Sequence, residues 1–174
     1  QNKMLEIRGI LNGTTNYILS RMVRGRISFE TALAEAQQKG YAERDPSADV
    51  DGLDAARKIV ILAAMSFGKR MDPNTILCEG ITGITAADSE LAKEMGYTIK
   101  LIGYTTKIDG KILAMVSPRL VPLYNPLHGI NGVFNGVLVS ADMVGEVMFY
   151  GPGAGKLPTA SAVAGDMLDI MSHT

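Results

Sequence analysis

The stretch that decides the architecture of this chain reads Gly40-Tyr-Ala-Glu-Arg-Asp-Pro-Ser-Ala-Asp-Val-Asp-Gly-Leu-Asp-Ala-Ala-Arg-Lys58. It places five carboxylates and one lysine at the entrance to a strongly apolar segment. Carboxylates repel one another, and a fold gathers them only where it supplies a compensating charge. The cluster is therefore either a solvated helix start or an active site.

The apolar segment predicts a helix from about Asp51 to Phe67. On this helix Asp54 and Lys58 form an i, i+4 pair, and Ile61 and Met65 continue the same stripe. Because the charged pair shares its face with apolar residues, we expect it to point into the protein or into a cleft.

Two other interpretations of the cluster are a solvated helix start and a calcium-binding loop. Acids at a helix N-terminus complement the macrodipole, and an i, i+4 pair on a surface contributes only roughly 0.2–0.5 kcal/mol. This interpretation stays open on spacing alone. Calcium is the other, because the first, third, fifth and sixth positions of an EF-hand loop fall on Ser47, Asp49, Asp51 and Gly52. Lys58 then stands at the twelfth position, which requires a bidentate glutamate, so we exclude calcium.

A second run of interest is Gly151-Pro-Gly-Ala-Gly-Lys156. Glycines let backbone N–H groups approach an anion, and a helix from about Pro158 would present its N-terminus to one. The spacing of a Walker A loop fails, because Leu157 follows the lysine. A phosphate contact and a flexible turn before an apolar helix are both compatible with this run.

The chain resembles the homoserine dehydrogenase family in three segments that occur in the family's order. The first is the acidic stretch above, which matches G-Y-x-E-x-D-P-x-x-D-x-x-G-x-D-x-x-x-K throughout. The other two are Gly9-Ile-Leu-Asn-Gly-Thr-Thr-Asn-Tyr-Ile-Leu19 and Gly151-Pro-Gly-Ala-Gly-Lys-Leu-Pro-Thr-Ala-Ser-Ala-Val163. The resemblance covers the chain from near residue 9 to about residue 170.

The resemblance implies the NAD(P)-dependent interconversion of L-aspartate 4-semialdehyde and L-homoserine, a step toward threonine, methionine and isoleucine. It implies that Lys58 is the catalytic lysine and Asp54 its neighbouring acid. It also implies that Glu43 holds the amino group of the substrate and that Asp49 is a further acid of the substrate site. A lysine ammonium can deliver a proton to the alkoxide that develops when a hydride reaches a carbonyl.

The resemblance also implies a dinucleotide cofactor, and the closing segment with Gly153, Ala154 and Gly155 is the part expected to contact it. No apolar strand of this sequence runs into G-x-G-x-x-G. We therefore expect the dinucleotide-binding domain upstream of Gln1, together with the monovalent-cation site, and any regulatory domain downstream. An isolated chain is expected to be inactive. The alternative is a non-catalytic module for dimerisation or ligand binding that retains the carboxylates.

The expected fold is one α+β domain over residues 1–174, with a mixed, mainly antiparallel sheet and helices packed on one face. By resemblance it is similar to the C-terminal domain of glyceraldehyde-3-phosphate dehydrogenase. One expected helix is capped by Thr14 or Thr15 and runs through about Val23; others start at Phe29 after the cap Ser28, and at the capping box Thr85–Asp88. Expected strands are Met4–Leu11, Tyr97–Ile108 and Lys111–Leu120 around the turn Asp109-Gly110, Val133–Ser140 and Glu146–Tyr150.

The composition excludes several classes of partner. The net charge is −1, from 17 basic and 18 acidic side chains, and no basic block indicates nucleic acid or an anionic membrane. There is no secretory segment or long apolar run, and the lone Cys78 fits a reducing cytoplasm. No metal is expected. The partners we expect are an amino-acid substrate and a second copy of the chain, paired through the sheet.

Overall fold

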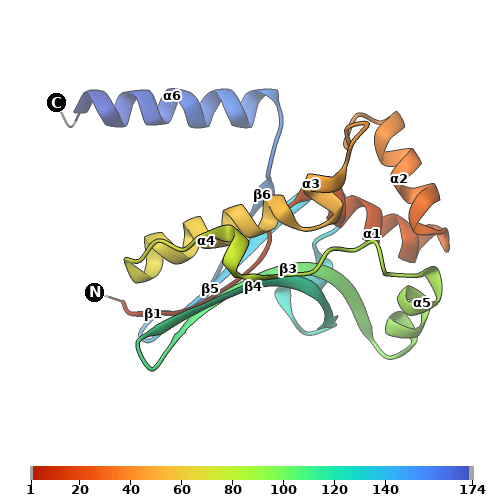
Figure 1. The fold of residues 1–174 in the computed structure, drawn as a ribbon, viewed down its shortest axis with the longest axis horizontal. Helices are drawn as coiled ribbons and strands as arrows, with labels where there is room; N and C mark the ends of the chain where they lie inside the picture. Colours follow the sequence, from red (N-terminus) through yellow and green to blue (C-terminus); the bar gives the residue numbers. More distant parts are fainter. Residues whose placement is uncertain (1, 173–174) are drawn as a thin grey trace.

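The computed structural model describes residues 2–172 as a six-stranded sheet with helices on one face (Figure 1). The sheet order is β2-β4-β3-β1-β5-β6. Every neighbouring pair is antiparallel except β2 and β4, which are parallel. The strands are β1 Met4–Ile10, β2 Leu77–Cys78, β3 Tyr97–Ile108, β4 Lys111–Pro122, β5 Phe134–Ala141 and β6 Gly145–Pro152. The expected α+β fold is confirmed, with the additional short strand β2.

The helices supply most of the core by covering one face of this sheet. They are α1 Gly13–Gly25, α2 Phe29–Gln38, α3 Ser47–Val50, α4 Leu53–Phe67 and α5 Ala86–Glu94. The remaining elements are the 3₁₀ turns η1 Pro73–Thr75 and η2 Pro126–Gly129 and the helix α6 Lys156–Ser172, which is not part of this layer. Ile18, Ile59 and Leu101 are among the buried side chains between helices and sheet. The other face carries a smaller cluster, in which Leu127 of η2 packs with Ile102 and other strand residues.

Helix α1 begins earlier than the expected Thr14 or Thr15, because Asn12 is its N-cap. The Asn12 backbone is extended, at φ −132° and ψ 119°, and its Oδ1 accepts from the backbone N–H of Thr15 at 2.9 Å. An asparagine caps a helix at least as well as a threonine, and the run contains both. The other expected caps are confirmed at Ser28 of α2 and at the Thr85–Asp88 capping box of α5.

The helix that we expected from about Asp51 begins at Leu53, because Gly52 separates it from the short α3, which was not expected. Asp51 ends the short α3, Gly52 adopts φ 84°, and α4 begins at Leu53. A Cβ at Gly52 would also lie 3.1 Å from Cys78 Sγ, so both the dihedral angle and the space favour glycine. The break sets the acids of α3 beside the first turn of α4.

The hairpin turn between β3 and β4 is confirmed, with positive φ at both Asp109 (49°) and Gly110 (76°). The C-terminal helix α6 stands away from the body of the domain (Figure 1), and all of its described residues are exposed. Within residues 2–172, no helix combines the length and the hydrophobicity that crossing a membrane requires.

Candidate active site

A cleft of about 430 Å³ lies where the start of α1, the α3–α4 junction, the start of β5 and the loop before α6 meet. It contains most of the residues that the sequence singled out. Its lining consists of Asn12, Gly13, Thr14, Gly40, Tyr41, Asp49, Asp54, Lys58, Val133, Asn135, Gly153, Ala154 and Gly155.

The catalytic pair predicted on α4 lies in this cleft. Lys58 Nζ is 2.7 Å from Asp54 Oδ2 and donates to the carbonyl of Leu11 at 3.0 Å. The side chains of Lys58 and Asp54 are 44% and 29% exposed, so both reach solvent. An ammonium has three donors, and these two contacts leave one for a molecule in the cleft. The expectation that the pair points into a cleft is confirmed.

Asn12 connects the acids of the cleft, a role that the sequence did not reveal. Its Nδ2 donates to Asp49 Oδ1 at 2.7 Å and to Asp54 Oδ2 at 2.9 Å. The same side chain caps α1 through its oxygen, so one amide fixes two carboxylates and one helix start. The only signal was its position at the head of the Asn12-Gly-Thr-Thr-Asn16 run.

Of the residues in the loop after α2, Tyr41 lines the cleft but the predicted Glu43 does not. Tyr41 lines the cleft and packs edge-to-face on Tyr17, with ring centroids 5.0 Å apart. Thr14 also lines it and donates to the Tyr41 carbonyl at 2.6 Å. Glu43 is exposed and is not among the lining residues; its backbone carbonyl accepts from Gln37 Nε2 at 3.0 Å. The assignment of Glu43 to the substrate therefore stays a prediction.

The glycine-rich loop forms another wall of the cleft through Gly153, Ala154 and Gly155. Gly153 packs directly on Asn135, since a Cβ at position 153 would lie 2.2 Å from Asn135 Nδ2. Asn135 Oδ1 is buried and has no hydrogen-bond partner among the described residues. Neither Asn135 nor Val133 was predicted, because nothing near them in the sequence indicates contact with the acids.

Ile61 and Met65 continue the stripe of Asp54 and Lys58 along α4. Although these two residues are apolar, they are not buried. Ile61 is 57% exposed and Met65 is 78% exposed. The cleft thus borders an apolar helix face that the described residues leave open. Among residues 2–172, no three His, Cys, Asp or Glu side chains are grouped as a metal site would require.

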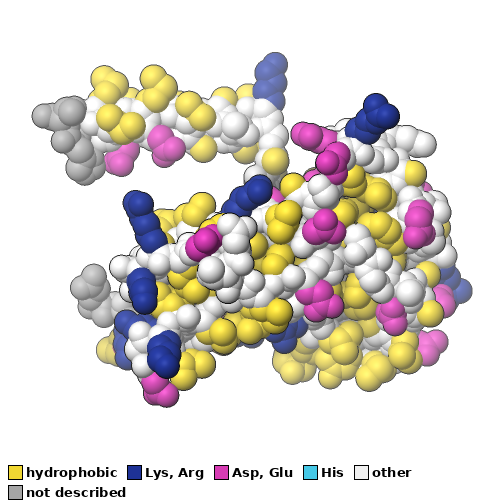
Figure 2. Space-filling view, in the orientation of Figure 1, with side chains coloured by type: hydrophobic (Ala, Val, Ile, Leu, Met, Phe, Trp, Pro, Cys, Tyr) yellow, Lys and Arg dark blue, Asp and Glu magenta, His cyan; other side chains and the backbone are white. Residues whose placement is uncertain are grey.

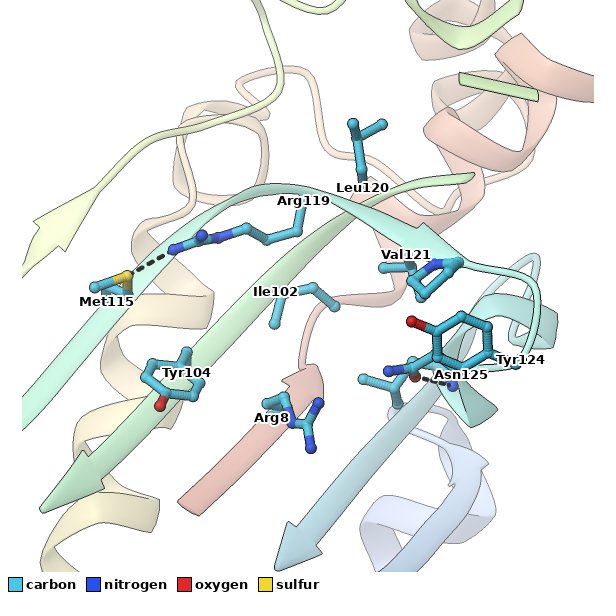
Figure 3. A pocket seen from close by; sticks show the side chains of 11 residues that line it. Arg8, Ile102, Tyr104, Met115, Arg119, Leu120, Val121, Tyr124 and Asn125 are labelled. Atoms are coloured by element: carbon cyan, nitrogen blue, oxygen red, sulfur yellow. Dashed lines mark hydrogen bonds between the residues drawn. The ribbon is translucent and has the colours of Figure 1, made fainter. Parts of the chain in front are cut away.

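A second hollow, of about 460 Å³, lies on the face of the sheet opposite the helices (Figure 3). Arg8, Tyr104, Arg119 and Tyr124 line it, together with apolar residues of β3 and β4. Arg119 donates to Ser117 Oγ at 2.9 Å and to Met115 Sδ at 2.8 Å, and Arg8 Nη2 lies 2.7 Å from Glu6 and from Glu146. None of the predicted site residues lies in this hollow.

Known proteins with similar sequences identify the family of this chain. The family model described as homoserine dehydrogenase matches residues 1–168. The chain is 51% identical to the homoserine dehydrogenase of Synechocystis sp. and 44% identical to that of Bacillus subtilis. The chain belongs to the homoserine dehydrogenase family. These alignments include 98% and 99% of the chain, and it spans about 40% of the length of each relative.

Solved structures of homoserine dehydrogenases share the fold. A Staphylococcus aureus homoserine dehydrogenase matches with a TM-score of 0.94 at 44% identity, over 99% of this chain and 43% of that one. A hyperthermophilic archaeal homoserine dehydrogenase mutant in complex with NADPH matches with a TM-score of 0.82 at 31% identity, over 99% and 49%. The family therefore carries this domain as part of a longer chain.

Proposed function

We propose that this chain is the substrate-binding and catalytic part of a homoserine dehydrogenase. The reaction is the NAD(P)H-dependent reduction of L-aspartate 4-semialdehyde to L-homoserine, for threonine, methionine and isoleucine biosynthesis. The observation that carries the proposal is Lys58, whose ammonium is held in the cleft by Asp54 and by the Leu11 carbonyl.

This geometry suits proton transfer to an aldehyde. When a hydride reaches the carbonyl carbon, negative charge develops on the oxygen, and the remaining N–H of Lys58 can stabilise that charge and deliver a proton. Asp54 fixes the direction of the ammonium, and Asn12 fixes Asp54. Asp49 lines the same cleft and offers a carboxylate for an α-ammonium group, and Glu43 is proposed to do the same.

When bound, NAD(P)H supplies the hydride. Gly153, Ala154 and Gly155 line the cleft that contains Lys58, which supports their contact with the cofactor. We propose that most of the cofactor is held by the part of the family chain that lies outside this match. Two apolar surfaces near the cleft are open to such a domain: the Ile61 and Met65 stripe on α4, and the exposed hydrophobic side chains of α6 (Figure 2).

The test uses an enzyme of full family length that contains this chain. Lys58→Ala is expected to lower kcat by roughly 10²–10⁴, the usual contribution of a general acid. Asp54→Asn should act in the same direction but less, and Glu43→Ala should mainly raise the KM for homoserine. Lys69→Ala, at an exposed lysine just after α4, is the matched control. Unchanged kcat in Lys58→Ala would exclude Lys58 as the proton donor and favour a solvated helix start instead.

We also propose a homodimer that pairs through the open face of the sheet. Leu123 and Tyr124, which follow β4, are 74% and 89% exposed, and Tyr124 lines the second hollow. A two-fold axis would cover the same apolar patch on both copies, as an isologous interface requires. Sedimentation equilibrium of the chain should give twice 18.6 kDa, and Tyr124→Glu should give the monomer mass. A wild-type monomer at high micromolar concentration would contradict the dimer.

A further inference from the structure

Lys100 on β3 is a buried lysine for which the proposed chemistry has no use. Its exposed fraction is 1%, and its Nζ donates to Asn16 Oδ1 at 3.0 Å, to Asn131 Oδ1 at 3.2 Å and to the Ile130 carbonyl. None of these acceptors is charged, and none of the ion pairs among the described residues includes Lys100. Burying a charge without a counter-ion is costly, so the contacts of this ammonium require an explanation.

Two of the three acceptors of Lys100 lie on one short segment, residues 130–134, which runs from the end of η2 to the first residue of β5. Ile130 and Asn131 are its first two residues. Asn16 of α1 binds the same segment, because its Nδ2 donates to the carbonyls of Gly132 and Phe134 at 3.0 Å each and to that of Ile130 at 3.3 Å. Lys100 and Asn16 also bind each other. We call this pair of side chains with residues 130–134 the clasp.

The clasp fixes one wall of the cleft. Val133 belongs to the held segment and Asn135 follows it directly, and both line the cleft that contains Lys58. The segment also lies against the first residue of α1, since a Cβ at Gly13 would be 2.7 Å from the Val133 carbonyl oxygen. A shift of the segment therefore moves Val133 and Asn135 relative to Asn12 and the acids that it holds.

We propose that Lys100 is a positioning residue: its ammonium holds residues 130–134 against α1 and so sets the cleft wall for homoserine. This inference rests on the proposed function for the identity of the ligand. An ammonium suits the task because it has three donors for the three oxygens that converge on it. A side chain without a donor in its place would leave Asn16 Oδ1 unsatisfied. The Ile130 carbonyl and Asn131 Oδ1 would keep only their longer bonds, at 3.3 Å, to Asn16 Nδ2 and Ser20 Oγ, which favours movement of the segment toward water.

The test compares Lys100→Met with Lys107→Met in an enzyme of full family length. Methionine is close in length to lysine but has no donor, and Lys107 is an exposed lysine on the same strand. Lys100→Met is expected to raise the KM for homoserine by roughly 10-fold or more, with a much smaller change in kcat. Asn131→Ala, outside the cleft lining, removes one acceptor and should give a smaller rise, so the inference is testable even if Lys100→Met fails to fold.

Hydrogen–deuterium exchange gives a second readout that needs no activity. Peptides that contain residues 130–135 should exchange faster in Lys100→Met and Asn131→Ala, while α4 and β3 keep their protection. An unchanged KM with unchanged exchange, or faster exchange spread evenly over the domain, would overturn the positioning role. The enzyme could instead be inactive with homoserine while residues 130–135 still exchange faster in the clasp variants. That result would refute the proposed function but support the role of Lys100 in holding the segment.

Discussion

Substituting Asn12 separates its role in the helix cap from its role in the cleft. Asn12→Ser keeps an oxygen that can cap α1 but removes the amide that bridges Asp49 and Asp54 at 2.7 and 2.9 Å. A hydrogen bond to a charged group contributes about 1.5–3 kcal/mol. Because both carboxylates border an open cleft and regain water, we expect Asn12→Ser to cost about 1–3 kcal/mol in total. Asn12→Ala should cost about 1 kcal/mol more through loss of the cap.

Asn12→Asp is the sharpest of these variants, because it keeps the cap and adds a third carboxylate beside two others. At the two distances above, Coulomb repulsion with an effective dielectric constant of about 20 is roughly 6 kcal/mol per pair before the side chains move apart. This repulsion raises the pKa of the introduced carboxyl in the folded state. The stability lost relative to wild type is therefore small below about pH 4 and grows as pH rises through that raised pKa.

Urea unfolding at several pH values between about 4 and 7 measures these differences. Ser28→Ala serves as a control, because Ser28 caps α2 through Thr31 and contacts no acid of the cleft. Above about pH 5 it should lose only the cap contribution, with no dependence on pH. Nearer about pH 4 its loss should shrink slightly, because the Ser28 hydroxyl lowers the pKa of the Glu30 carboxyl and Ser28→Ala removes that effect. If Asn12→Ser is as stable as wild type and Asn12→Asp shows no pH dependence, Asn12 is only a helix cap and the bridged acids are incidental.

Two further predictions concern Lys100 and Gly153. Burial, and then repulsion by Arg24, lowers the pKa of Lys100 from 10.5 to about 8. The unfolded chain therefore holds more protons between these values, and the stability of wild type relative to Lys100→Met should rise by up to roughly 3 kcal/mol as pH increases from about 8 to 10.5. Arg24 and the strand-paired Arg119 are present in both proteins, so a flat difference in urea unfolding would contradict the buried charge. Gly153→Ala places a Cβ 2.2 Å from Asn135 Nδ2 and should cost roughly 1–3 kcal/mol in a thermal or urea melt. Gly151→Ala, where a Cβ meets nothing within 4 Å, should be tolerated, and equal effects of the two would refute the contact.

The sequence predicted the parts of the fold that short-range hydrogen bonds determine. The cap at Ser28 and the capping box at Thr85 depend on bonds to residues three positions away, and both are present. The Asp109-Gly110 turn needs positive φ at two residues that tolerate it, and it also formed. The start of α1 was misplaced, because Asn12 and the threonines that follow it are all competent caps and their order alone does not choose among them.

The acids with Lys58 and the Gly153–Gly155 loop were predicted as parts of the site, and both line the cleft, but the wall formed by Val133 and Asn135 was not predicted. Lys58, Asp54 and Asp49 belong to one continuous motif, so their proximity follows from the α3–α4 junction. Val133 and Asn135 come from a segment whose position depends on bonds to α1 and β3, far away in sequence. Lys100 gave no signal of this role, because a lysine in a strand pattern ordinarily indicates a solvent-facing position. Long-range polar contacts between unlike segments leave no periodic pattern that a single sequence reveals.

The run from Asn12 to Asn16 at the start of α1 contacts both the acidic wall of the cleft and the wall that contains Val133. Asn12 holds the acids of α3 and α4, and Asn16, one turn later, holds residues 130–134. Between them, Gly13 leaves room for the Val133 carbonyl, and Thr14 Oγ1 donates to the Tyr41 carbonyl. These four residues thus contact three parts of the cleft: the acids of α3 and α4, residues 130–134, and the Tyr41 loop. The run therefore needs its two amides, its glycine and its hydroxyl at fixed positions, although an amphipathic helix start alone would need only a cap.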